Sequence, residues 1–387
     1  MANMQKYIKD VRLSGYKSIK NVTCEFDQGL NIIIGNNGSG KSNLLEFVYK
    51  IVKRDYSGLD IFDAKINFVD VNESMPNSDF EALREKNFTW HAERRIAKKE
   101  EGFEANGLEL VEPETHDLIS IFFVRFNAPK VIGILSHELN AKYNFKNKRF
   151  LLDSYEEDIP EVLSVWLRNV FNKNYLENIK AANELTDEYL HSSLEKSFDD
   201  EFSIIKKKLA FYTPIEDLRF SNAVRITNID SSTYEFRNIV FEYKINNQWF
   251  AWDSLSDGTR RLIYMVFTIN GIESFSYHTP YKYIPITLLE EPEIGIHPHQ
   301  LHLILDFLRE KSKEQQIIIT THSPQVLDIL GPDELNKIII AEIDYENGTV
   351  LRHLNEEEIK KARFYFKDEG LLSDYWRFSD FQRDKEK

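Results

Sequence analysis

The segment GNNGSGKS, residues 35–42, constrains what this chain can fold into more than any other part of its sequence. It fits the pattern G-x-x-x-x-G-K-[ST] at every position. The apolar run GLNIII, residues 29–34, precedes it, and residues 42–52 follow with apolar side chains at helical spacing. The glycines let the backbone curl closely around a phosphate, and the N-terminus of a following helix adds a favourable dipole. The sequence therefore predicts a phosphate-binding loop between a buried strand and an amphipathic helix.

Residues in and just after this loop are the first candidates for nucleotide contacts. Lys41 is expected to reach the β- and γ-phosphates of ATP, and Ser42 is expected to hold Mg²⁺. The other residues expected to bind the nucleotide are Asn36, Asn37, Gly38, Ser39, Gly40 and Asn43. The alternative is a Gly/Asn-rich turn with a chance lysine, which the flanking strand and helix disfavour.

A second candidate site follows another apolar segment. Residues 286–289 (ITLL) run directly into Glu290-Glu291-Pro292-Glu293. Adjacent carboxylates at the end of an apolar strand are costly unless a cation or another partner offsets their charge. Glu290 is therefore expected to bind Mg²⁺, and Glu291 is expected to be the general base that orients water onto the γ-phosphate. A solvated acidic loop is the alternative.

Two more segments carry candidate residues. LSDGTR, residues 255–260, precedes a predicted helix, with Ser256 as a natural N-cap and Gly258 leaving bare backbone near the helix start. The predicted strand QQIIIT is followed by His322, at the kind of sheet edge where ligands bind in open α/β folds. His322 is therefore expected to contact the γ-phosphate. An ordinary capped helix and a core histidine are the alternatives.

The order of predicted elements favours the α/β class, because strands alternate with helices in a way typical of an at least partly parallel sheet. Residues 56–222 differ in character: they contain the polar stretch WHAERRIAKKEEGFEANG and the helical patterns EVLSVWLRNVF and LTDEYLHSSLEKSF. We expect this region to form an inserted, mainly helical lobe. Residues 346–387 are expected to add a last strand and a charged, aromatic helical tail, which is a candidate docking surface.

Composition narrows the function classes. The net charge of −14 argues against a wholly basic nucleic-acid channel, although a local basic strip is compatible with it. The one cysteine, Cys24, cannot form a disulfide within the chain, which suits a reducing cytoplasm. The N-terminal residues lack the apolar core of a signal peptide, and no apolar run reaches the ~18 residues of a membrane-spanning helix. We expect a cytoplasmic protein with no membrane partner.

Taken together and in this order, four segments resemble the ATP-binding-cassette (ABC) ATPases of the SMC and RecF kind. GNNGSGKS, LSDGTR, LLEEPE and THS match their Walker A, signature, Walker B and switch motifs. EEPEIGIHPHQ, residues 290–300, is closer to the ATPases of OLD-type (overcoming lysogenization defect) nucleases. The resemblance covers residues 1–55 and 223–345. It implies an α/β ABC-ATPase head, a P-loop NTPase with a mixed sheet and N-terminal antiparallel strands.

The resemblance also implies a mechanism. In that family two heads dimerise head to tail with two ATP molecules between them. Ser256 and Gly258 of one subunit would then bind the γ-phosphate held by Lys41 of the other subunit. Glu291 would be the hydrolytic base and His322 the γ-phosphate sensor. ATP and Mg²⁺ are the expected ligands, a second copy is the expected partner, and slow ATP hydrolysis is the expected activity.

The chain departs from the family pattern in three ways. Glu290 stands where the first Walker B carboxylate is usually Asp, and residues 55–220 contain no convincing Q-loop glutamine, so that Mg²⁺ ligand stays unassigned. OLD-type nucleases also carry a TOPRIM domain, and roughly 40 residues after the last predicted strand are too few for one. We therefore expect any effector to be encoded separately.

Two functional hypotheses follow from these features. The first is a nucleotide-gated dimeric sensor or scaffold for a separate effector, a nuclease or toxin, in anti-phage defence. The alternative is a RecF-like ATPase that binds DNA in repair, which clusters of basic residues favour although such runs are usually solvated helix faces. These residues are Arg94, Arg95, Lys98, Lys99, Lys206, Lys207 and Lys208. A transporter ATPase subunit fits the N-terminal strands and the EPEIGIHP segment poorly.

Overall fold

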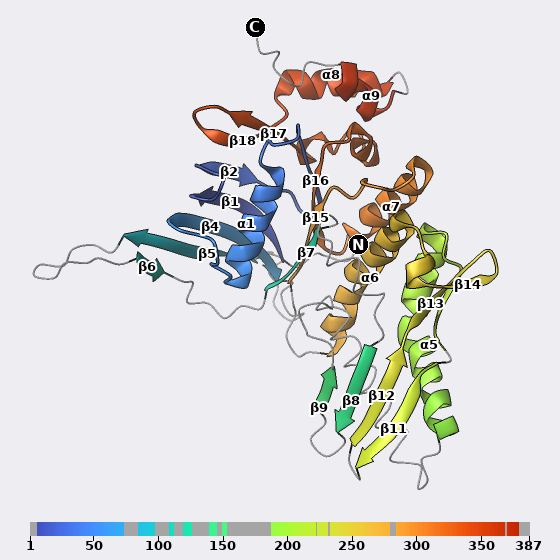
Figure 1. The fold of residues 1–387 in the computed structure, drawn as a ribbon. Helices are drawn as coiled ribbons and strands as arrows, with labels where there is room; N and C mark the ends of the chain where they lie inside the picture. The colour runs from blue at the N-terminus through green and yellow to red at the C-terminus, as the bar shows by residue number, and fades with distance from the viewer. Residues whose placement is uncertain are drawn as a thin grey trace, which may run out of the picture. The chain divides into compact units, whose positions relative to one another are not determined.

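The computed structural model describes residues 6–72, 84–96, 108–111, 119–125, 139–144, 149–152, 187–221, 223–230, 233–278, 284–367 and 370–378. The chain divides into two compact units (Figure 1). The first contains Met1–Val124, Lys282–Glu293 and Leu305–Lys387, and the second contains Arg125–Tyr281 and Ile294–Ile304. Each unit has its own sheets and core.

A six-stranded sheet forms the centre of the first unit, in the order β18-β17-β3-β16-β15-β7. Its strands are β3 (Leu30–Ile34), β7 (Ile119–Arg125), β15 (Ile284–Glu290), β16 (Gln316–Thr321), β17 (Ile338–Asp344) and β18 (Gly348–His353). Strands β15, β16, β3 and β17 are parallel, and β18 returns antiparallel to β17. Every residue of β3 and β16 is buried, as expected for central parallel strands that each carry a run of three isoleucines. The carboxyl ends of β3, β16 and β15 therefore lie at one edge.

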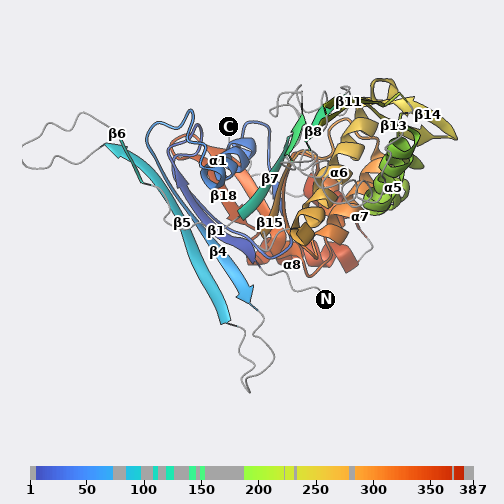
Figure 2. The ribbon, with the colours of Figure 1, turned by 90° about the horizontal axis from the view of Figure 1, so that it is seen from below.

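The second sheet of this unit is antiparallel, in the order β2-β1-β4-β5-β6. Its strands are β1 (Lys6–Ser14), β2 (Val22–Glu25), β4 (Phe62–Asn72), β5 (Arg84–Ile96) and β6 (Leu108–Val111). Helix α1 (Lys41–Lys53) lies between the two sheets (Figures 1 and 2). Its side chains Leu44, Phe47 and Ile51 belong to one hydrophobic core with residues of both sheets. This core fixes the helix that follows the phosphate-binding loop.

The described part of residues 56–222 contains more strand than the expected mainly helical lobe would have. Strands β4 to β10 and one helix, α5 (Asp187–Tyr212), occupy the described part, and β4 and β5 extend the antiparallel sheet of the first unit well beyond residue 55. In the polar stretch that begins at Trp90, Trp90 and Ala92 alternate with His91 and Glu93, and the two apolar side chains are buried. This two-residue period is that of a half-buried strand, and the charges between the apolar positions hid it. The helix expected over 185–198 is present as α5, whereas the one expected over 161–171 lies outside the described residues.

The second unit contains two antiparallel sheets, ordered β10-β13-β14 and β11-β12-β8-β9. Their strands are β8 (Leu139–Asn144), β9 (Arg149–Leu152), β10 (Asp217–Phe220), β11 (Arg225–Asp230), β12 (Thr233–Ile239), β13 (Phe241–Ile245) and β14 (Gln248–Ala251). Helix α5 packs on β10 and on α6 (Asp257–His278). The rings of Phe198, Phe202 and Phe241 form much of this core, with centroids 4.1–6.0 Å apart. This core holds the start of α6, where the LSDGTR segment lies.

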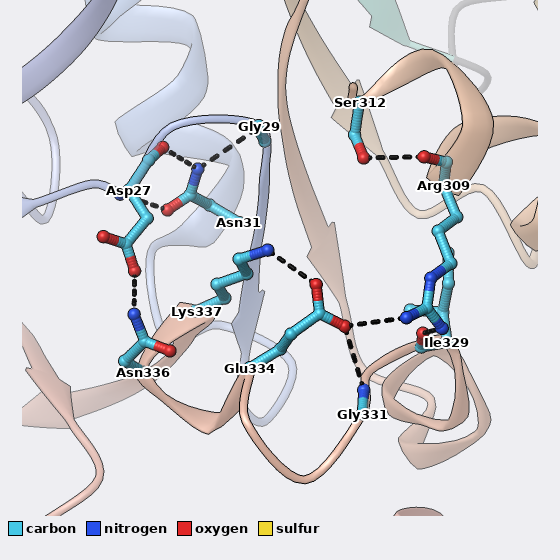
Figure 3. Close-up of polar contacts among 10 residues, drawn as sticks. All are labelled: Asp27, Gly29, Asn31, Arg309, Ser312, Ile329, Gly331, Glu334, Asn336 and Lys337. Carbon is cyan, nitrogen blue, oxygen red and sulfur yellow. Dashed lines mark hydrogen bonds and ion pairs between the residues drawn. The ribbon is translucent and has the colours of Figure 1, made fainter. Parts of the chain in front are cut away.

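A polar network fixes the edge of the six-stranded sheet opposite the candidate site (Figure 3). Glu334 accepts hydrogen bonds from Lys337 Nζ at 2.7 Å, Arg309 Nη2 at 3.0 Å and the Gly331 N–H at 3.0 Å. Arg309 lies near the end of α7 (Pro298–Lys311), and Lys337 immediately precedes β17. Burial alone raises the pKa of Glu334, but the hydrogen bonds from Lys337 and Gly331 and the charges of Lys337 and Arg309 outweigh it, so the pKa is lowered.

The C-terminal segment adds β18, α8 (Glu356–Lys367) and α9 (Leu372–Phe378) to the first unit, as the sequence predicts. Its aromatic residues differ in exposure. Tyr375 is buried, whereas Phe364 is 66% exposed. Within the helices that the structure describes, none combines the length and apolar character needed to cross a bilayer.

Candidate active site

Three loops meet at the carboxyl edge of the six-stranded sheet because their strands are neighbours in it. Residues 35–42 follow β3, Glu290–Glu293 end and follow β15, and Thr321-His322 end and follow β16. Thr321 pairs with Ile34, Glu290 pairs with Thr320, and the Glu291 N–H donates to the Thr320 carbonyl at 2.8 Å. Segments almost 290 residues apart in the sequence thereby form one site.

The phosphate-binding loop has the backbone that its glycines predict. Gly38 and Gly40 have left-handed φ angles of +82° and +92°, and α1 begins directly after Gly40. No side chain caps the start of α1, and its first turn contains no acidic residue. The Ser39 hydroxyl is buried without a hydrogen-bond partner in the described part of the chain. A helix N-terminus with such an orphaned hydroxyl fits a phosphate group.

Lys41 is buried inside this loop. Its Nζ donates to the carbonyl oxygens of Gly35 at 2.8 Å and Asn36 at 2.9 Å. Burial lowers the pKa of Lys41, and the charges of Glu291, Glu293 and Glu290 oppose that shift. Three carboxylates therefore lie close enough to act on one ammonium group. An ammonium has three N–H donors, so the two carbonyl contacts leave one for an anion.

The other residues predicted to bind the nucleotide differ in exposure and in contacts. Asn36 and Asn37 are exposed, and Ser42 is half-buried in the first turn of α1. The side chain of Asn43 donates to Ser18 Oγ at 2.8 Å, and Thr349 Oγ1 donates to the same oxygen at 2.8 Å. Asn43 thus contacts the loop between β1 and β2, a role the sequence did not indicate.

The carboxylates after β15 are held in different ways. Glu290 is buried at the strand end. Glu291 adopts a left-handed φ of +46°, unusual for a residue with a side chain, directly before Pro292. Its Oε1 lies 3.4 Å from His322 Nδ1. The bend at Glu291 therefore brings the predicted base and the predicted sensor together.

Glu293 is the residue of this cluster to which the sequence assigned no role. Its Oε1 accepts hydrogen bonds from Thr321 Oγ1 at 2.5 Å and from the His322 N–H at 3.3 Å, and its side chain is 8% exposed. Burial raises the pKa of Glu293, although the Thr321 hydrogen bond and the His322 charge act to lower it. The one available signal was its place in the same EEPE run as Glu290 and Glu291.

The cluster as a whole has the chemistry of a cation site. Three carboxylates face one lysine, so negative charge is in excess before any phosphate binds. Mg²⁺ prefers such oxygen ligands together with nucleotide phosphates. Glu290 at the end of β15 and Ser42 in the first turn of α1 supply carboxylate and hydroxyl oxygens of the required kind.

The signature segment lies in the second unit, where Ser256 caps α6 as predicted. Ser256 Oγ accepts from the Thr259 N–H at 3.2 Å, and Ser256 is exposed. A Cβ atom at Gly258 would come within 2.6 Å of the Gly295 carbonyl oxygen. The absence of a side chain at Gly258 therefore allows close packing against residues 295–296. The sequence instead predicted that the glycine leaves its backbone open near the helix start.

Comparison with known proteins supports this interpretation of the motifs. The family model AAA_21, described as "AAA domain, putative AbiEii toxin, Type IV TA system", matches residues 30–328, a span that holds every predicted site residue. The chain belongs to this family. The chain is therefore an ATPase of this AAA family.

Several curated relatives match most of the chain, among them a Septu protein, a retron ATPase and a RecF protein. The Septu protein PtuA of Bacillus thuringiensis is 21% identical over 90% of this chain and 78% of its own length. The retron Vc95 probable ATPase of Vibrio cholerae serotype O1 biovar El Tor is 23% identical over 89% of this chain and 75% of its own. The DNA replication and repair protein RecF of Clostridium kluyveri is 22% identical over 87% of this chain and 96% of its own.

Proposed function

We propose that this protein is a slow ATPase that works as a nucleotide-gated dimeric switch for a separately encoded effector in anti-phage defence. One observation carries the ATPase part of the proposal. The phosphate-binding lysine, three carboxylates and a histidine meet at the carboxyl edge of one sheet, with Glu291 Oε1 3.4 Å from His322 Nδ1.

Different residues of the chain would bind the phosphates, hold Mg²⁺ and activate the water. Lys41 and the N-terminus of α1 hold the phosphates, and Glu290 with Ser42 would hold Mg²⁺, which neutralises phosphate charge when bound. Glu291 accepts the proton of the attacking water, and His322 beside it contacts the γ-phosphate. The left-handed turn at Glu291 aims its carboxylate at His322 and so places the base.

The dimer completes the site in this proposal. Ser256 is exposed at the N-terminus of a 22-residue helix, and such a terminus attracts anions. Ser256 and Gly258 of one copy would bind the γ-phosphate held by Lys41 of the other, as the ABC resemblance implies. ATP binding then favours the closed dimer, and hydrolysis releases it.

The defence role rests on the relatives. Two of the three are proteins of the Septu and retron systems, and each matches about nine-tenths of this chain. The effector would dock on a surface that changes with nucleotide state. Co-expression with the products of neighbouring genes, followed by affinity purification with and without ATP, tests this part. A chain that purifies alone in both states and gives no phage protection with its neighbours would contradict it.

The hydrolysis itself is tested by phosphate release. Wild-type protein should release phosphate slowly, Glu291→Gln should bind ATP without releasing phosphate, and Lys41→Ala should lose ATP binding. Hydrolysis by Glu291→Gln at the wild-type rate would remove Glu291 from the role of base.

A RecF-like DNA-binding ATPase is the second candidate, favoured by the RecF relative. The basic residues within the described ranges offer limited support. Arg95 pairs with Glu93 at 2.7 Å, and Lys206 pairs with Asp199 at 2.6 Å, whereas Lys207 is exposed. Lys98 and Lys99 lie outside those ranges. DNA binding that weakens steeply with salt would favour this candidate, because phosphate contacts release counterions.

A further inference from the structure

Glu293 is the most constrained ionisable group near the phosphate-binding loop that the proposed mechanism leaves unused. Its side chain is more than nine-tenths buried, on the same turn as Glu290 and Glu291. A buried carboxylate costs free energy unless it is paired or hydrogen-bonded. Its place in the fold therefore calls for a specific role.

One oxygen of Glu293 holds the end of β16. Oε1 accepts from the Thr321 hydroxyl at 2.5 Å and from the His322 N–H at 3.3 Å, and Thr321 Oγ1 in turn accepts from the Ser323 N–H at 2.9 Å. These contacts fix the backbone on both sides of His322. A single carboxylate oxygen thus joins the turn after β15 to the turn after β16.

Two carboxylates lie near the same nitrogen of the His322 ring. His322 Nδ1 is 3.4 Å from Glu291 Oε1 and 3.9 Å from Glu293 Oε1. Glu293 therefore constrains the position of His322 through its backbone N–H.

The second oxygen of Glu293 is an unused acceptor. Oε2 is buried and has no hydrogen-bond partner in the ranges that the structure describes. It lies on the carboxylate whose charge acts on Lys41 in the phosphate-binding loop. An orphaned buried acceptor at a polar site is typically satisfied by a water molecule, and hydrolysis of ATP consumes one.

We propose that Glu293 is a positioning residue of the ATPase site, which fixes His322 through Oε1 and orders the site water through Oε2. This inference rests on the proposed ATPase function and extends it. Glu293 takes no proton and forms no bond to the nucleotide. It acts through His322 and through the water that Glu291 activates.

The decisive comparison is between Glu293→Ala, Glu293→Gln and Thr321→Val. Glu293→Ala should lower kcat for ATP about 10²-fold, since misplacing a catalytic group by about 1 Å has that effect, while KM and the binding of a fluorescent ATP analogue stay within about threefold. Glu293→Gln retains an acceptor oxygen and should recover part of the rate. Thr321→Val should lower kcat, and combining it with Glu293→Ala should add little, because both changes break the same contact.

One control and four outcomes decide the inference. Alkylation of Cys24 should be as slow in each variant as in the wild type, because the head stays folded. Unchanged kcat in Glu293→Ala, or additive losses in the double variant, would overturn this inference while leaving the ATPase proposal intact. Raised KM with unchanged kcat would likewise overturn it. A wild-type protein that neither binds nor hydrolyses ATP would overturn both.

Discussion

Replacement of Gly40 by alanine tests whether the phosphate-binding loop is held as the structure describes. Gly40 has φ +92°, and a Cβ atom there would lie 1.8 Å from Thr349 Oγ1 and 2.6 Å from Ser18 Oγ. Thr349 is fully buried and donates to Ser18 at 2.8 Å, so neither side chain can move freely.

The expected cost of Gly40→Ala has two parts. A left-handed backbone costs a residue with a Cβ about 1–2 kcal/mol, and forcing an extra methyl group into a packed site costs about 1–3 kcal/mol. The first unit should therefore lose about 2–5 kcal/mol of stability. Gly38→Ala is the matched control, because Gly38 has φ +82° but no atom within 4 Å of an added Cβ. It should lose only the backbone part, about 1–2 kcal/mol.

The single cysteine provides the assay. Cys24 is buried in β2 of the first unit, so its labelling by a thiol reagent across a urea series reports opening of that unit alone. Binding of a fluorescent ATP analogue, measured in parallel, should be lost in Gly40→Ala and retained in Gly38→Ala. Equal stability of the two variants would refute the steric argument, as would normal ATP binding by Gly40→Ala.

Two further predictions concern titratable groups. Burial raises the pKa of Cys24 to about 12. The thiol should therefore react with a disulfide reagent at pH 8 orders of magnitude more slowly in the native protein than in the unfolded protein. Comparable rates in the two states would contradict the buried placement of Cys24. The pKa of Glu334 is lowered in the folded state, so its charge stabilises the protein above the unfolded value of about 4.3, and this contribution is lost as pH falls through the folded pKa. Glu334→Gln should therefore cost about 1 kcal/mol at pH 7 and almost nothing near pH 3, measured by urea unfolding; a cost independent of pH would show that packing, and not charge, is involved.

Much of the head was predictable because its elements carry strong local signals. The isoleucine runs of β3 and β16 indicate buried strands, and the loop after β3 fits the pattern G-x-x-x-x-G-K-[ST] at every position. The capping role of Ser256 also follows from its sequence neighbourhood alone.

The remainder depended on contacts between distant segments. Strand β5 was hidden because polar and charged residues, such as Thr89, His91 and Glu93, alternate with its apolar ones, and because its pairing with β4 is not evident from the sequence. The role of Glu293 depends on Thr321 and His322 on a neighbouring strand, 28 and 29 residues away. Likewise, Gly258 is required because of Gly295, a contact that periodicity cannot reveal.

The most direct test of the central claim is the mass of the Glu291→Gln protein in solution, measured by light scattering with and without ATP and Mg²⁺. The chain has a mass of 45.6 kDa. The account predicts a step from one chain to two when ATP and Mg²⁺ are added, because blocked hydrolysis traps the closed dimer, and no step when Lys41→Ala is combined with Glu291→Gln. A mass that is unchanged by ATP although the nucleotide binds, or a step that persists without Lys41, would contradict a nucleotide-gated dimer.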